Sequence, residues 1–327
     1  MARAIRYDRF GEPTEVLRLH ELPDAEPGPG EVLVRMTARS VNPSDLLTIR
    51  GTYAQHTPLP STPGWEGVGT VVAAGPGASA DLVGKRVLPL RGAGTWQELV
   101  TAPAAWAVPV PAGIADGMAA QLYINPVAVW LMLTEELRLA PGDVLLVNAA
   151  GSACGRIAAQ LCRERGLRMV GIVRSDAYTD ELRALGAAAV VNTAREPVGP
   201  VVARLTEGRG AAAALDAVGG AAGAALLDHL APGGALLAYG LLSGALLRPD
   251  AAELARRGLT ARDYWLRRWV ERCTPEAWHT AFAAIMERVA NGRLVLPVAA
   301  AYDLADVAQA VRAAEASGRS GKILLAG

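Results

Sequence analysis

A turn of small residues at 149–155 is the first segment of this sequence whose residue types and spacing could do chemistry. It follows the apolar run 144–148 and leads into a helical stretch. A strand, a small-residue turn and a helix start point backbone N–H groups and the positive end of the helix dipole at a pyrophosphate. Ala150 and Ser152 replace the first two glycines of the GxGxxG dinucleotide motif, and only Gly155 remains. The turn by itself is therefore equally compatible with an ordinary strand-to-helix connection.

The end of the next apolar run, 169–173, indicates which dinucleotide the turn would hold. Arg174 follows about 20 residues beyond the last glycine of the turn, where the side chain that reads the adenine ribose is expected. An acid there would accept a hydrogen bond from the 2′-hydroxyl of NAD, whereas Arg174 offers a planar donor fork to a 2′-phosphate and Ser175 adds a hydroxyl. The sequence therefore predicts NADPH in preference to NADH. Two alternatives stay open: Arg174 could be an ordinary solvated arginine, and Asp176 could touch the ribose or neutralise Arg174.

Histidine and cysteine, two common zinc ligands, are not arranged as a metal site. Zinc needs three or four converging Cys, His or carboxylate ligands. The histidines are isolated, and the cysteines are odd in number and lack CxxC spacing, so the sequence predicts reduced thiols and no disulfide framework. These residues are His20, His56, His229, His279, Cys154, Cys162 and Cys273.

Two regions with different sequence patterns must position these groups. From the N-terminus to about residue 111, short β-type runs punctuated by glycine and proline predict a small, mostly β, barrel-like domain. From about residue 123, apolar strands alternate with alanine-rich helical stretches, which indicates βαβ units and a parallel sheet. The expected strands of this second part are 144–148, 169–173, 189–192, 215–218, 235–239 and 259–264.

The last part of the chain adds two helices and a strand. Thr274 as cap and Pro275 at the first helical position predict the start of a helix that runs to Val289. Asp303 opens a shorter helix, and the run 322–325 is of β type.

Length and composition limit the class of protein. A chain of 327 residues exceeds what one compact core usually holds, which favours two domains. It is 51% hydrophobic and 20% charged with a formal net charge of zero, so it lacks the basic footprint of a nucleic-acid-binding protein and is expected to act on small molecules. No leader-like segment opens the sequence and no apolar run reaches membrane-spanning length, so we expect a cytoplasmic protein without membrane association.

The order of these segments resembles the medium-chain dehydrogenase/reductase superfamily along nearly the whole chain. The resemblance implies an α/β fold with a GroES-like, β-rich catalytic domain over residues 1–122, completed by 293–327, and a Rossmann NADP-binding domain with a doubly wound parallel sheet over 123–292. Zinc-dependent members carry a Cys ligand and a Gly-His-Glu sequence where this chain has Asn42 and Trp65, and their four-cysteine lobe is missing here. We therefore expect a zinc-free member.

Within the zinc-free branch, the sequence is most similar to the NADPH-dependent 2-enoyl thioester reductases. The similarity lies in residues 51–53 and 64–66, in Asn125 with the proline after it, and in short stretches that follow in order through the nucleotide domain. The resemblance implies that Tyr53 is the catalytic acid and that Asn42, at a vacated zinc-ligand position, orients the nicotinamide or the substrate. It also implies a set of residues around NADPH. These are Asn125, Gly151, Ser152, Ala153, Cys154, Arg174, Ser175, Asp176, Tyr239, Gly240, Leu241, Leu242, Tyr264, Trp265, Leu266 and Lys322.

A tyrosine suits the reaction that this resemblance implies. Hydride from NADPH goes to the β-carbon of an α,β-unsaturated acyl thioester on CoA or a carrier protein, enolate charge develops at the carbonyl oxygen, and the α-carbon then takes a proton. A phenol with an unperturbed pKa near ~10 stays protonated at neutral pH, so it can donate a hydrogen bond and a proton. Tyr53 follows a glycine on an expected loop, where such groups commonly lie. A loop tyrosine with a solvated hydroxyl is the alternative.

Two departures from the enoyl reductases leave the substrate open. Trp65 stands where that family has asparagine, and the threonine that commonly follows Asn125 and its proline is absent. Because pocket shape decides the substrate, an NADPH:quinone or enone oxidoreductase of the ζ-crystallin type is the second hypothesis. An NADPH-binding sensor or structural protein without efficient turnover is the third. The resemblance, together with the apolar segment 233–247 interpreted as an exposed sheet edge, further predicts a homodimer.

Overall fold

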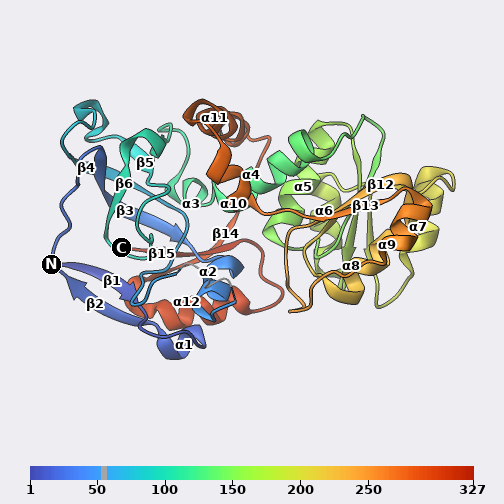
Figure 1. Cartoon of the computed structure of the whole chain (residues 1–327), viewed down its shortest axis with the longest axis horizontal. Coiled ribbons are helices and arrows are strands. Elements are labelled where there is room, and N and C mark those ends of the chain that lie inside the picture. The colour runs from blue at the N-terminus through green and yellow to red at the C-terminus, as the bar shows by residue number, and fades with distance from the viewer. Residues whose placement is uncertain (53–56) are drawn as a thin grey trace. The chain divides into compact units, whose positions relative to one another are not determined.

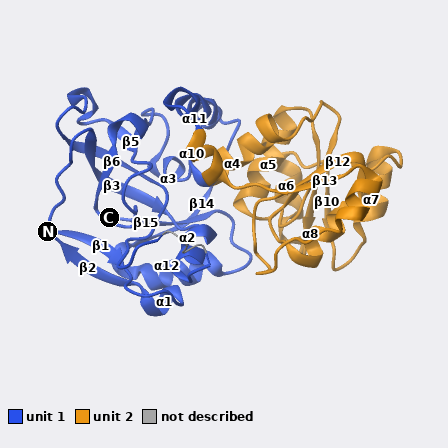
Figure 2. Ribbon diagram, in the orientation of Figure 1, with its two compact units in different colours: residues 1–124, 273–327 blue, residues 125–272 orange. Residues whose placement is uncertain are grey.

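Two segments that lie far apart in the sequence form the first of the two units of this chain. The computed structural model describes residues 1–52 and 57–327. Unit 1 comprises Met1–Ile124 and Cys273–Gly327, and unit 2 comprises Asn125–Arg272 (Figure 2). The chain thus returns to unit 1 at residue 273, whereas the sequence analysis set this return at residue 293.

Unit 1 is built around β3 (Glu31–Ser40), a long strand most of whose residues are buried. β3 pairs antiparallel with β4 (Gly67–Ala74), β6 (Leu99–Pro103) and β15 (Lys322–Ala326). Because β15 comes from the end of the chain, the sheet ties the C-terminal segment to the N-terminal one. The other strands of unit 1 are β1 (Ala2–Arg6), β2 (Arg18–Leu22), β5 (Arg86–Leu88), β7 (Val108–Pro109) and β14 (Val298–Asp303).

The long helix α11 (Pro275–Ala290) belongs to unit 1, although the sequence analysis had expected it in the second domain. Aromatic packing explains its place, because the Trp278 ring lies 5.5 Å from that of Tyr123, and its indole Nε1 donates to the Trp106 carbonyl at 3.2 Å. Thr274 caps the helix as predicted, accepting from the Ala277 N–H. The other helices of unit 1 are α1 (Pro13–Val16), α2 (Pro43–Ile49), α3 (Asp116–Ala119) and α12 (Val307–Glu315), with single turns at Ala80–Leu82, Ala104–Trp106 and Leu304–Asp306.

Six parallel strands form the sheet of unit 2, in the order β10-β9-β8-β11-β12-β13. The chain enters at the central strand β8, builds one half of the sheet outward through β9 and β10, and then builds the other half. This order confirms the doubly wound parallel sheet predicted from the sequence. The strands are β8 (Val144–Val147), β9 (Arg168–Val173), β10 (Ala189–Asn192), β11 (Ala211–Asp216), β12 (Leu230–Ala238) and β13 (Thr260–Asp263).

Helices cover both faces of this sheet (Figure 1). On one face α5 (Ala153–Glu164) packs against β9 and against α6 (Thr179–Leu185). On the other face, side chains from three helices join Leu146 and Leu236 of the strands in one hydrophobic cluster. These helices are α7 (Val198–Thr206), α8 (Gly220–Leu227) and α9 (Ala251–Arg257). Unit 2 also contains α10 (Leu266–Arg272), most of α4 (Ile124–Leu131), the π-helical turn Met132–Glu136 and the single turn Asp176–Tyr178.

The apolar segment 233–247 is not the exposed sheet edge that the sequence analysis assumed. Its first part lies in β12, which is paired on one side with β11 and on the other with β13. The outer strand is β13, whose sequence Thr-Ala-Arg-Asp is largely polar and exposed. The apolar run of β12 is explained by burial within the sheet, so it no longer supports a homodimer.

Candidate active site

Asn148 and Asp216 join the carboxyl ends of β8 and β11, the two strands at which the order of the sheet reverses. Asn148 Nδ2 donates to Asp216 Oδ1 at 2.6 Å, and the Ala217 N–H donates to Asn148 Oδ1 at 2.7 Å. The backbone N–H groups of Val218 and Gly219 also donate to the Asp216 carboxylate. Open α/β sheets bind their ligands in the crevice outside this reversal point. The Asn148–Asp216 pair therefore fixes the edge at which a dinucleotide would lie.

The turn after β8 has the geometry of a phosphate-binding turn. The Ser152 hydroxyl caps α5 by accepting from the Gly155 N–H at 3.2 Å. A Cβ on Gly155 would lie 2.2 Å from the Ala150 carbonyl oxygen, so only glycine permits this approach of helix to strand. The first N–H groups of an α-helix have no acceptor within the helix and lie at the positive end of its dipole. The turn therefore fits the pyrophosphate of a dinucleotide.

Arg156 holds this turn in place from the helix side. Its guanidinium forms two hydrogen bonds with the Glu181 carboxylate of α6, both at 2.7 Å, and donates to the Gly151 carbonyl. A Cβ on Gly151 would lie 2.7 Å from the Tyr178 ring, so the turn requires glycine at this position as well. The sequence analysis assigned no role to Arg156, because its importance comes from contacts with a different helix.

The other unit 2 residues that the resemblance assigns to NADPH lie at the same edge of the sheet. Residues 239–242 follow β12 and residues 264–266 follow β13, and the carboxyl ends of parallel strands meet at one edge. Asn125, at the start of unit 2, accepts a hydrogen bond from the Cys154 thiol at 3.3 Å. The Tyr239 hydroxyl is buried, and this burial raises its pKa, so it stays neutral. The fold thus gathers the predicted cofactor residues of unit 2 around one edge.

The segment after β9 carries the two side chains on which cofactor choice depends. Arg174 is exposed, and no hydrogen bond or ion pair holds its side chain among the residues that the structure describes. Asp176 is held by two other partners: Asn192 Nδ2 donates to its Oδ1 at 2.8 Å, and Arg195 Nη1 lies 2.6 Å from its Oδ2. Ser175 caps the following turn by accepting from the Ala177 N–H at 3.3 Å. Asp176 is therefore paired with Asn192 and Arg195 and forms no ion pair with Arg174.

A buried polar cluster in unit 1 contains Asn42, which stands where zinc-dependent members carry a cysteine ligand. Asn42 Nδ2 donates to Glu66 Oε1 at 2.8 Å, and Lys322 Nζ donates to Asn42 Oδ1 at 2.6 Å. The second oxygen of Glu66 accepts from the N–H groups of Tyr123 and Ile124, at 3.1 and 2.9 Å. The side chains of Asn42, Glu66 and Lys322 are all buried. Both ends of the Asn42 amide are thus used within the protein, which fits a role in positioning.

Asp45 lies beside this cluster and closes the first turn of α2. The Asn42 N–H donates to its Oδ2 at 2.7 Å, which forms one half of a capping box. Its other oxygen is buried without a hydrogen bond from any described residue, and burial raises the pKa of Asp45 from 3.8 to about 8, with the Glu66 charge as a further cause. Asp45 is therefore mainly protonated at neutral pH. Lys322, expected near NADPH from the resemblance, belongs to unit 1 and is buried in this cluster.

Tyr53 and Trp65 are the two remaining positions that the sequence analysis singled out. Tyr53, the expected catalytic acid, lies outside the described residues. Trp65, which precedes Glu66, has 49% of its surface exposed. The indole at this departure from the enoyl reductases is therefore a surface group of unit 1 and does not fill the core.

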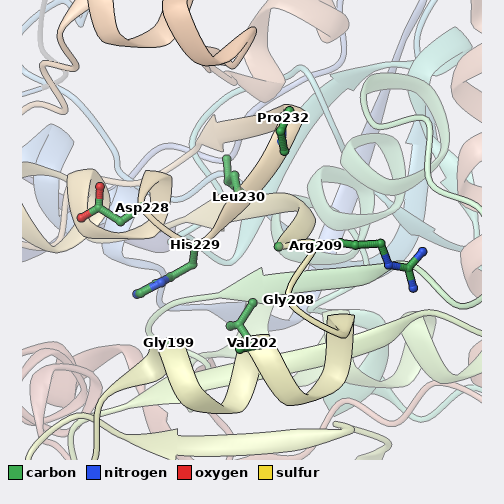
Figure 3. A pocket seen from close by; sticks show the side chains of 10 residues that line it. Gly199, Val202, Gly208, Arg209, Asp228, His229, Leu230 and Pro232 are labelled. Carbon is green, nitrogen blue, oxygen red and sulfur yellow. The ribbon is translucent and has the colours of Figure 1, made fainter.

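An open pocket of about 300 Å³ lies elsewhere in unit 2 (Figure 3). Its walls come from α7 and from the segments that precede β11 and begin β12, so it lies at the amino edge of the sheet, opposite the phosphate turn. Figure 3 shows the side chains of Arg209 and His229 extending in opposite directions, so they do not converge on one ligand. We assign no function to this pocket.

Neither a metal cluster nor a membrane-spanning helix is found in the described part of the chain. No group of three or more His, Cys, Asp or Glu side chains among residues 1–52 and 57–327 could hold a metal ion. No helix there is long and apolar enough to cross a membrane.

Sequence reasoning missed several residues that shape the site. Glu66 was noted only as part of a motif, and Asp216, Asp45 and Arg195 were given no role. A usable signal existed for Asp216, because a charged residue at the end of an apolar run must find a partner when it is buried. No local pattern marks Arg195, whose partner Asp176 lies on another loop.

Two protein-family models match the chain. The alcohol dehydrogenase GroES-like domain matches residues 28–112, and the zinc-binding dehydrogenase model matches residues 153–287. These matches confirm a GroES-like first domain and a Rossmann-like second domain.

Curated relatives and solved structures extend the match to nearly the whole chain. The mitochondrial enoyl-[acyl-carrier-protein] reductase of Bos taurus is 32% identical over 316 residues, which is 95% of this chain and 85% of the relative. A Bacillus thuringiensis structure, provisionally assigned as an NADPH:quinone reductase, is 42% identical with a TM-score of 0.96, covering 100% of this chain and 99% of that one. The Escherichia coli quinone oxidoreductase complexed with NADPH is 26% identical with a TM-score of 0.91, and each chain is covered fully.

Proposed function

This chain belongs to the medium-chain dehydrogenase/reductase superfamily, and from that premise we propose that it reduces the C=C bond of an α,β-unsaturated acyl thioester with NADPH. The family is NADP-dependent, and the chain is an oxidoreductase of the group that contains enoyl reductases and quinone oxidoreductases. The observation that carries the finer proposal is the 32% identity, across 95% of the chain, to an enoyl-[acyl-carrier-protein] reductase. Whether the acyl group is carried on CoA or on a carrier protein is left to the assay.

The cofactor edge of unit 2 supplies binding and orientation. NADPH provides the hydride that goes to the β-carbon of the substrate. The start of α5 would bind its pyrophosphate, and glycine at positions 151 and 155 allows the turn to pack against the Tyr178 ring and the Ala150 backbone. Arg174, whose guanidinium has no partner within the described residues, would pair with the 2′-phosphate. These contacts are the reason for assigning NADPH rather than NADH.

The residues of unit 1 would handle the charge and the proton. As hydride reaches the β-carbon, negative charge develops on the thioester carbonyl oxygen. In our proposal the Tyr53 hydroxyl donates a hydrogen bond to that oxygen and supplies the proton that the α-carbon takes, since a phenol remains protonated at neutral pH. Asn42 acts as a positioning residue, because Glu66 and Lys322 hold both ends of its amide.

A quinone or enone oxidoreductase is the second candidate, and a specific observation favours it. The solved structures with 42% and 26% identity carry quinone reductase assignments. A substrate panel separates the two candidates: NADPH oxidation is followed by absorbance with crotonyl-CoA, longer enoyl thioesters and simple quinones at matched concentrations. We expect kcat/KM for the enoyl thioesters to exceed that for quinones. The reverse order would assign the quinone activity. Tight NADPH binding without oxidation by any acceptor would favour the third hypothesis, a sensor or structural protein.

Oligomeric state and location remain proposals. We propose a homodimer on the basis of the family resemblance alone, since the β12 segment offered as support is buried within the sheet. Light scattering tests this, because a dimer has twice the 34.0 kDa mass of one chain. A cytoplasmic location also stays a prediction, and the mitochondrial relatives make organelle fractionation the relevant test.

A further inference from the structure

The segment after β9 contains two residues that would favour different cofactors. Arg174 suits the 2′-phosphate of NADPH, whereas Asp176 is the type of residue that accepts from the 2′-hydroxyl of NADH, and both fall about 20 residues beyond Gly155. We propose that Arg195 sets the preference for NADPH by forming an ion pair with Asp176. The pair compensates the charge of the Asp176 carboxylate, which would otherwise favour NADH. This inference rests on the NADPH dependence in the proposed function and adds the residue that enforces it.

The strand register brings the two residues together. β9 and β10 are parallel neighbours, with Val173 opposite Asn192 at their carboxyl ends. The Thr193 N–H extends this pairing by donating to the Val173 carbonyl at 3.0 Å. The loops that leave the two strands therefore start side by side, and Asp176 on one loop meets Arg195 on the other. Two residues from separate loops are thus neighbours at the cofactor edge.

Both oxygens of the Asp176 carboxylate are occupied. Asn192 donates to Oδ1 at 2.8 Å and Arg195 lies 2.6 Å from Oδ2, so the acid is fixed from two sides. Arg174 takes no part in this arrangement and keeps its donor fork available. The described arrangement therefore leaves the Arg174 guanidinium exposed, while both carboxylate oxygens of Asp176 have partners.

Losing Arg195 would change two properties of the edge at once. The negative charge of the Asp176 carboxylate would lose its counter-charge, and its repulsion of the 2′-phosphate would weaken NADPH binding. Its Oδ2 would also be available to a 2′-hydroxyl, which strengthens NADH binding. The Arg195 and Asp176 side chains are 76% and 44% exposed, so the ion pair is partly screened by water and the effect is modest. We expect the ratio of NADPH to NADH affinity to fall by about fivefold.

Direct binding in a double-mutant cycle tests this inference. The wild-type protein, Arg195→Ala, Asp176→Asn and the double variant are each titrated with NADPH, NADH, 2′-phospho-ADP-ribose and ADP-ribose by calorimetry. Arg195→Ala should lower the NADPH/NADH affinity ratio, whereas the same change made on top of Asp176→Asn should leave the ratio almost unaltered. Arg209→Ala is the matched control, because it removes a similarly exposed, ion-paired arginine at the opposite edge of the same sheet.

Two results of these titrations would overturn the role of Arg195. An unchanged ratio in Arg195→Ala overturns the inference. An equal loss in the presence and absence of Asp176→Asn also overturns it, since Arg195 would then contact the phosphate directly and not act through Asp176. The titrations use no acyl substrate, so a failure of the enoyl reductase proposal would leave their result intact. A wild-type protein without any NADPH preference would instead contradict the proposed cofactor use.

Discussion

Lys322 donates a hydrogen bond from its ammonium to Asn42 Oδ1 at 2.6 Å, although 280 positions separate the two residues. The contact follows from the antiparallel pairing of β15 with β3, in which Leu324 lies opposite Ser40. Continuing that register brings Lys322 across from Asn42. Glu66 then completes the cluster from the other end of the amide. A lysine, an amide and a carboxylate thus satisfy one another around Asn42, which stands at the position of a cysteine ligand in zinc-dependent members.

The first prediction concerns this cluster. Lys322→Met should lower the free energy of unfolding by about 1–3 kcal/mol, because it removes a charged partner and leaves the buried Asn42 oxygen without its donor. Thermal and urea unfolding measure the change. Lys85→Met is the control, since Lys85 is exposed and should tolerate the same substitution. Equal stability of the two variants would contradict a structural role for Lys322.

The second prediction is a pH dependence that originates at Asp45. Its pKa is about 8 in the folded protein against an ordinary value of 3.8, so between these values the folded state keeps a proton that the unfolded state has lost. The contribution of Asp45 to stability is therefore full below about pH 4 and is lost as the pH rises toward 8. Asp45→Asn cannot ionise and should remove this trend.

Unfolding at several pH values from about 5 to about 8 checks the second prediction. The difference in unfolding free energy between Asp45→Asn and the wild type should shift in favour of the variant as the pH rises. Parallel pH profiles for the two proteins would show that Asp45 does not titrate in this window.

A third prediction concerns cofactor preference. The protein should bind NADPH at least about tenfold more tightly than NADH, since Arg174 can pair with the 2′-phosphate, and Arg174→Ala should remove that preference. Fluorescence titration with both cofactors measures the ratio. If the ratio is the same in the variant as in the wild type, Arg174 is a solvated arginine without this role.

The fourth prediction addresses Tyr53. Tyr53→Phe should lower kcat for enoyl thioester reduction by about 10²-fold or more with little change in NADPH affinity, which is the usual scale for a positioned general acid. Because phenylalanine keeps the ring, the melting temperature should not change. Quinone reduction can draw its proton from solvent and should suffer much less. A variant that reduces enoyl thioesters at the wild-type rate would make Tyr53 a bystander and favour the quinone reductase hypothesis.

A fifth prediction is metal independence. Dialysis against a strong chelator should change neither activity nor melting temperature, because Asn42 and Trp65 stand at positions where zinc-dependent members carry ligands. Elemental analysis before and after dialysis provides the check. Stoichiometric zinc that is lost together with activity would overturn this expectation.

The sequence by itself determined the elements and their order. Apolar runs at strand length, separated by helical stretches, predicted the alternation of strands and helices in unit 2, and 189–192 was predicted with its observed bounds. The strand expected at 215–218 was placed too late in the chain, because β11 spans Ala211–Asp216. Thr274 and Pro275 predicted the start of α11. These features depend on periodicity, capping and turn residues, which act over a few neighbouring positions and can be read from the chain directly. The role of Tyr53, by contrast, rests on family resemblance alone.

Only the tertiary structure decided which polar groups meet. Asp216 pairs with Asn148, Lys322 with Asn42, and Arg195 with Asp176, and in each case strand pairing brings together residues that are distant or on separate loops. Tertiary packing also placed α11 in unit 1 and covered β12, where sequence reasoning had expected the second domain and an open edge. The physical reason is the same in all these cases: the residue that a polar group or an apolar run meets depends on strand order and register, which local sequence does not encode.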